Sequence, residues 1–122
     1  MGRRLNARVT KGDPMGASVL EVRTSADGSV VIAPHGIVGL DKAVELRQVL
    51  VHTVRRVRPL RLILDLSDVP ELDPINVGSV AAACDLGDDL QVAVFVHNPL
   101  PLLAEQLTAA GVPHQRLRNS MS

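Results

Sequence analysis

The chain has 122 residues, and its 13 basic and 13 acidic side chains cancel to a formal charge of zero. This length suits one domain with its own core, and the lack of a basic excess argues against nucleic acid as the main partner. No apolar run approaches the ~18–20 residues that cross a bilayer, and a single cysteine excludes an intramolecular disulfide. We therefore expect a small soluble domain in the reducing cytoplasm, without direct insertion into a membrane.

The N-terminal segment differs in composition from the rest of the chain. Residues 1–17 are polar, rich in glycine and arginine, and without a hydrophobic period, so we expect a flexible arm. They are basic but lack the apolar segment of a secretory signal. The remainder predicts one domain over 18–118 and a short tail over 119–122.

A hairpin and a helix are expected next. Apolar and polar residues alternate over 19–23, and a second apolar run follows at 30–33, so the turn residues of 25–29 predict a β-hairpin. Over 41–57, apolar residues recur at spacings of three and four, which predicts an amphipathic helix that ends before Pro59. The remaining positions of this helix include Lys42, Glu45, Arg47, Gln48, Arg55 and Arg56.

The middle of the chain predicts a buried strand and a capped helix. The apolar run over 60–66 is typical of a central strand. Asp73 is a favoured N-cap residue, and Pro74 already has the backbone φ angle of a first helical residue. We expect the helix to end at Gly87, with Cys84 as a small buried thiol.

The last third repeats the alternation of strand and helix. A strand is expected over 91–96, a helix capped by Asn98 as far as Gly111, and a short polar strand over 115–118. Strand–helix–strand units require parallel strands. The fold class is therefore α/β: a mixed sheet, with an antiparallel hairpin followed by parallel strands, and helices mainly on one face.

No metal or cofactor site is expected from the spacing of polar residues. No histidine lies three or four residues from another histidine or from Cys84, so the spacing typical of metal ligands is absent. An acidic cluster has two interpretations, a metal site or a helix cap with flanking loop residues, and the cap explains its best-placed member. The cluster consists of Asp65, Asp68, Glu71 and Asp73. No nucleophile, base and orienting group come together, so we expect no enzyme.

Three segments resemble the STAS domain, the family of bacterial anti-sigma factor antagonists. The sequence LILDLSDV at 62–69, with Asp73 and Gly78 after it, is similar to the family's central signature. The segment 36–46 is similar to an earlier glycine–alanine–leucine block, and 98–112 to the family's strand–proline–helix–glycine ending. The resemblance covers roughly 19–117 and implies the fold expected above, without the family's final helix.

One departure from this family changes the expected regulation. Phosphorylated members have Asp-Ser-Ser/Thr-Gly at the start of the second helix, where the anti-sigma kinase modifies the second hydroxyl. This chain has Pro74 and Ile75 at the two hydroxyl positions. An alkyl group cannot accept phosphate, so we expect no switch there, although Ser67 and Ser79 are nearby hydroxyls. Ile75 is either part of a constitutive protein interface or packed under the loop.

The resemblance implies a protein-binding regulatory module whose partner is an anti-sigma factor or a related kinase-like protein. The alternative is a STAS-type scaffold of a stressosome-like complex or a cytoplasmic subunit of a membrane transporter. The expected partner surface combines the end of the second strand, the start of the first helix and the start of the second helix at 73–79. Its residues are Gly36, Gly39, Asp41, Asp73, Ile75, Asn76 and Ser79.

Overall fold

The computed structural model describes residues 19–119, so the expected arm at 1–17 and residues 120–122 lie outside the described part. Strands and helices alternate after an initial hairpin, in the predicted order. The strands are β1 (Val19–Thr24), β2 (Val30–His35), β3 (Arg61–Asp65), β4 (Ala93–His97) and β5 (Leu117–Arg118). The helices are α1 (Ala43–His52), α2 (Pro74–Leu90) and α3 (Pro101–Ala109).

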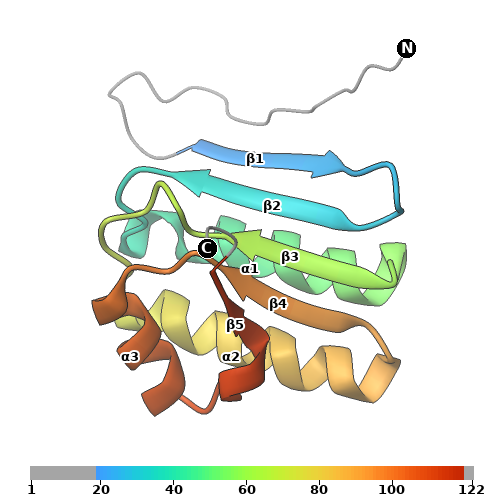
Figure 1. Ribbon diagram of the computed structural model, residues 1–122. Coiled ribbons are helices and arrows are strands. Elements are labelled where there is room, and N and C mark those ends of the chain that lie inside the picture. The colour runs from blue at the N-terminus through green and yellow to red at the C-terminus, as the bar shows by residue number, and fades with distance from the viewer. Residues whose placement is uncertain (1–18, 120–122) are drawn as a thin grey trace.

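One mixed sheet contains all five strands in the order β1-β2-β3-β4-β5. The hairpin β1–β2 is antiparallel, and every later pair is parallel. Figure 1 shows α1 and α2 side by side behind the sheet, with α3 next to α2. The predicted fold class is therefore confirmed, including the weak fifth strand.

The core lies between the sheet and the helices. Alternate residues of β3 and β4, such as Leu62 and Val96, are fully buried, whereas Ile63 and Phe95 are half-buried on the opposite face. This period of two is what a sheet with one covered face requires. The layer arrangement brings the carboxyl ends of β2, β3 and β4 to one edge of the sheet, which is where ligand and partner sites of open α/β folds commonly lie.

Two predicted helix boundaries were wrong. Gly87 does not end α2, because the helix continues to Leu90. A Cβ at Gly87 would lie 2.5 Å from the carbonyl oxygen of Val92, so this glycine permits the close approach of α2 to the segment that leads into β4. Asn98 does not cap α3, because its backbone is left-handed (φ 59°) and the helix begins at Pro101.

The end of the first helix is also unusual. After His52 the chain forms a π-helical turn, Thr53–Val57, in which the Arg58 amide donates to the carbonyl oxygen of Thr53 at 2.8 Å. The backbone of Arg58 is left-handed (φ 51°), so the helix ends before Pro59, as predicted. A π turn inserts an extra residue into the helix and turns the side chains that follow it to a different face.

Candidate functional site

Backbone hydrogen bonds join the two loops that follow β2 and β3. The Gly36 amide donates to the Asp68 carbonyl at 2.9 Å, and the Val38 amide donates to the Glu71 carbonyl at 3.0 Å. The Asp73 amide then donates to the Val38 carbonyl at 3.0 Å. These bonds extend the parallel pairing beyond the strands, so the start of α2 is held against the loop before α1.

A buried side chain completes this connection. Asn76 is 0% exposed, and its Nδ2 donates to the carbonyl oxygens of Val38 and Gly39 at 3.0 and 2.9 Å. We expected Asn76 at a partner surface, but burial leaves its side chain no contact area for a partner in this structure. Its part in the site is to position the loop before α1 against the start of α2.

The start of α2 has the predicted cap. The Asp73 side chain accepts a hydrogen bond from the Ile75 amide at 3.0 Å, and Pro74 occupies the first turn. Ile75 is 52% exposed, so it is not packed under the loop. Ser79 is half-buried and donates back to the Ile75 carbonyl at 3.3 Å. The helix therefore begins with an apolar side chain in solvent.

Four apolar side chains, each at least half exposed, belong to the segments that meet near this point. They come from the loop before α1, the start of α2 and the start of α3, and we call them the apolar rim: Ile37, Leu40, Ile75 and Leu102. Ile37 and Leu102 line a depression of about 350 Å³ together with Pro70 and Pro74. The rim thus gathers segments that are far apart in the sequence around one hollow.

Sequence reasoning missed three rim residues, Ile37, Leu40 and Leu102. For Leu102 no decisive signal exists in the sequence, because Leu103 follows it directly and adjacent helix positions, such as residues 83–84 of α2, can both be buried. The structure buries Leu103 and exposes Leu102. For Ile37 and Leu40 no periodic signal exists, because both lie in a loop or a short 3-10 turn.

Acidic groups border the rim. Glu71 and Asp73 line the depression, and Asp41 is exposed on the short turn before α1. Gly36 has a left-handed backbone (φ 94°) where β2 turns into the loop, and Gly39 precedes the turn. Of the predicted partner residues, the structure therefore groups Gly39, Asp41, Asp73 and Ile75 near the hollow.

A histidine links the hairpin to the acidic loop after β3. His35 Nδ1 lies 2.7 Å from an oxygen of Asp68, and Nε2 lies 2.8 Å from an oxygen of Glu21. Both ring nitrogens can donate only when the ring is protonated. The hydrogen bonds with Glu21 and Asp68 accordingly raise the pKa of His35 above its ordinary value of 6.5.

Other reactive groups lie apart from the rim. Cys84 is buried as predicted, and burial raises the pKa of its thiol to about 11. Within residues 19–119, no three His, Cys, Asp or Glu side chains lie close enough together to hold a metal ion. Among the same residues, no helix is long and apolar enough to span a membrane.

Comparison with known proteins identifies the fold. No family model matches the chain, and no curated protein matches it. Solved structures do match, and the fold that they share with this chain is that of the anti-sigma factor antagonists, the STAS fold.

Three of these structures show the range of the likeness. The Bacillus cell fate determinant SpoIIAA in its phosphorylated form has a TM-score of 0.71 and 14% identity, over 84% of this chain and 92% of that one. An anti-sigma factor antagonist from Mycobacterium paratuberculosis has a TM-score of 0.59 and 26% identity, over 76% and 79% of the two chains. A sulfate transporter family protein from Wolinella succinogenes has a TM-score of 0.63 and 17% identity, over 78% and 79%.

Proposed function

We propose that this chain is a regulatory module that binds a protein partner through the apolar rim, in the manner of an anti-sigma factor antagonist. The observation that carries the proposal is the exposure of Ile75 at the start of α2, beside the hollow lined by Ile37 and Leu102. Isolated exposed apolar residues are common, but several around one hollow are typical of an interaction site. The partner that we propose is an anti-sigma factor or a related kinase-like protein.

The rim suits constitutive binding that phosphorylation at the helix start does not interrupt. A phosphate would add about −1.5 to −2 charges and three strong acceptors, which oppose a closely packed interface by repulsion and desolvation. Ile75 presents only an alkyl group, and its amide is already bonded to Asp73. We therefore propose that partner binding is controlled by the concentrations of the two proteins or by changes in the partner.

The experiment uses two substitutions of exposed apolar residues. The partner is captured from the source cell with the full chain and identified, and its binding is then measured by titration calorimetry. Ile75→Glu should abolish binding and leave the fold intact, because a helix N-terminus tolerates an anion, whereas burying that carboxylate costs several kcal/mol. The matched control is Leu60→Glu, since Leu60 is 79% exposed but lies ahead of β3, at the opposite edge of the sheet.

The outcomes separate the alternatives. Loss of binding by Ile75→Glu alone, with unchanged circular dichroism, supports the rim as the interface. Equal binding of both variants would place the interface elsewhere. Capture of membrane transporter subunits or of a large scaffold complex, in place of a kinase-like protein, would favour the transporter or stressosome-like alternative.

A further inference from the structure

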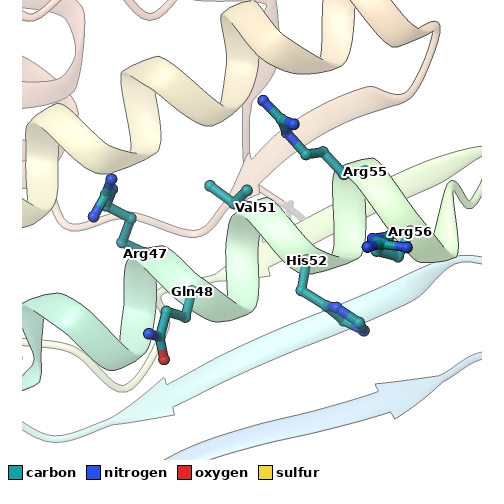
Figure 2. Close-up of a pocket in the computed structure, with 6 residues that line it drawn as sticks. All are labelled: Arg47, Gln48, Val51, His52, Arg55 and Arg56. Atoms are coloured by element: carbon teal, nitrogen blue, oxygen red, sulfur yellow. The ribbon is translucent and has the colours of Figure 1, made fainter.

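A second surface lies on the solvent side of α1, in its second half and the π turn after it. Two rows of side chains border an open groove of about 460 Å³, and we call this the arginine groove: Arg47, Gln48, Val51, His52, Arg55 and Arg56. The members of each row are four residues apart, so they follow one another along the helix. Figure 2 shows Arg47, Val51 and Arg55 on one side of the helix, with Gln48 and His52 on the other.

Within the described part of the chain, no acidic side chain pairs with the arginines of this groove. Among residues 19–119, Arg47, Arg55 and Arg56 make no ion pair or hydrogen bond through their guanidinium groups. Elsewhere, Arg61 pairs with Asp27 at 2.6 Å and Arg116 with Asp88 at 2.5 Å. The chain is neutral as a whole, so the positive charge of this face results from segregation of charge within one small domain. Such a face attracts anionic groups.

An apolar hollow adjoins the arginine groove. It has a volume of about 510 Å³, lies between α1 and the β1–β2 hairpin, and is lined by Val22, Val49 and Val57. Gln48 and His52 line both hollows, so the two form one continuous surface. One half of this surface offers guanidinium groups and the other half offers valine side chains.

The π turn determines the position of the side chains at one end of this surface. Thr53 donates from its hydroxyl to the Val49 carbonyl at 2.8 Å, and its own carbonyl accepts from the Arg58 amide. Val57 and two of the three arginines of the groove follow Thr53, so the extra residue of the turn determines which face they occupy. π turns are rare and are found frequently at functional sites.

We propose that this face of α1 binds an acidic amphipathic helix of a protein partner. The apolar row of such a helix would fill the valine-lined hollow, and its carboxylates would pair with the arginines, whose planar groups suit bidentate hydrogen bonds to carboxylates. The chain's own first 18 residues do not fit, because they contain Arg3, Arg4, Arg8 and Lys11 but only one acid. Nucleic acid fits less well, because the chain has no net positive charge and only one aromatic residue.

This surface is independent of the proposed function. The apolar rim lies at the edge of the sheet where β2 and β3 end. Helix α1 runs from there towards the opposite edge, where β3 begins, and the arginine groove lies along its later part (Figure 1). A partner helix on α1 would therefore leave Ile75 free. Failure of one site in an experiment does not imply failure of the other.

The test uses a designed probe and the full chain. The probe is a fluorescein-labelled peptide of about 18 residues, which spans about five helical turns, with leucine along one face and glutamate on both flanks. A second peptide has the same composition in a permuted order without an amphipathic face. Binding is followed by fluorescence anisotropy at low and high salt. We expect the amphipathic peptide to bind, and to bind more weakly as salt rises.

Substitutions then locate the site. The double variant Arg47→Glu/Arg55→Glu should weaken binding about tenfold or more, because reversed charges face the glutamates. Arg47→Lys/Arg55→Lys keeps the charge and should retain most of the binding, and Ile75→Glu should bind as the parent does. Circular dichroism confirms that each variant is folded.

Four results would overturn the proposal. The first is an amphipathic peptide that does not bind, and the second is a permuted peptide that binds equally well. The third is a double variant with unchanged affinity. The fourth is self-association of the protein alone, measured by sedimentation, that the double variant abolishes; that result would assign this face to a second copy of the chain.

Discussion

The side-chain amide of Asn76 donates to the carbonyl oxygen of Val38 at 3.0 Å, across 38 residues of sequence. With a second bond to the Gly39 carbonyl at 2.9 Å, it fixes the loop before α1 to the first turn of α2. Both segments contribute side chains to the apolar rim, so this one buried side chain helps to fix how Ile37 and Leu40 lie relative to Ile75. The rim is therefore a property of tertiary structure and of no single segment.

Asn76→Ala should destabilise the domain. It removes one of the two donors to the Val38 carbonyl oxygen and the side-chain donor to the Gly39 carbonyl oxygen, and losses of this kind cost about 1–3 kcal/mol. Asn76→Asp should cost more, because a carboxylate would face two carbonyl oxygens. The free energy of unfolding is measured by urea denaturation, with Ser79→Ala as the control, since Ser79 makes only a 3.3 Å bond within its own helix. Similar losses for Ser79→Ala and Asn76→Ala would contradict the assignment.

The cap of α2 gives a second prediction. Asp73→Ala removes the acceptor for the Ile75 amide and should cost about 0.5–2 kcal/mol, or several degrees of melting temperature. Asp73→Asn keeps an oxygen in the same place and should lose much less. Calorimetric melting of the three proteins distinguishes the cap from a purely electrostatic role, for which both variants would lose stability equally.

The predicted outline of the fold depended on patterns that neighbouring residues determine. Alternation over 19–23, the apolar run over 60–66 and the Asp73–Pro74 cap are local signals, and the structure contains the corresponding strands and helix start. The errors arose where a distant segment decides the outcome. Gly87 lies inside α2 because Val92 and Val94 approach it, and no feature of the sequence near 87 indicates that approach.

The candidate site was likewise predictable only where neighbouring residues determine it. The absence of a hydroxyl at Ile75 is visible in the sequence, but its exposure depends on how the loops pack. Asn76 was predicted as a surface residue because it lies in the motif at the helix start; its burial results from the pairing of that segment with the loop after β2. The arginines of α1 were predicted on the solvent face of the helix, and only the π turn and the hairpin give them an apolar neighbour.

The stability of the domain should depend on pH in part through the protonation of His35. Its pKa is raised by hydrogen bonds with Glu21 and Asp68, so its contribution to folding is fully present below the ordinary value of 6.5 and is lost as pH rises through the raised value. His97 has the opposite sign, because burial lowers its pKa and stability increases as pH rises towards 6.5. The two effects therefore occur on opposite sides of pH 6.5.

His35→Gln isolates the first effect. The melting temperature of the parent should fall between pH 6.5 and mildly alkaline pH by more than that of the variant. His97→Gln serves as the control and should keep the alkaline decrease of the parent. A parallel decrease in the parent and in His35→Gln would show that the contacts with Glu21 and Asp68 do not hold His35 in its protonated form.

The last prediction concerns phosphorylation at the start of α2. When the partner captured in the experiment proposed above is a kinase, it and ATP should add no phosphoryl group to residues 73–79 of this chain. Ile75 offers no hydroxyl, and Ser79 lies one turn further along, bonded to the Ile75 carbonyl. Intact-mass measurement followed by peptide mapping gives the answer. Ile75→Ser is the matched comparison, since it restores a hydroxyl at the helix start beside the Asp73 cap. A kinase that modifies Ile75→Ser but not the parent would show that the side chain at position 75 alone prevents phosphorylation at the helix start. A modified Ser79 or Ser67 in the parent would contradict the prediction, because another hydroxyl would then accept the phosphate.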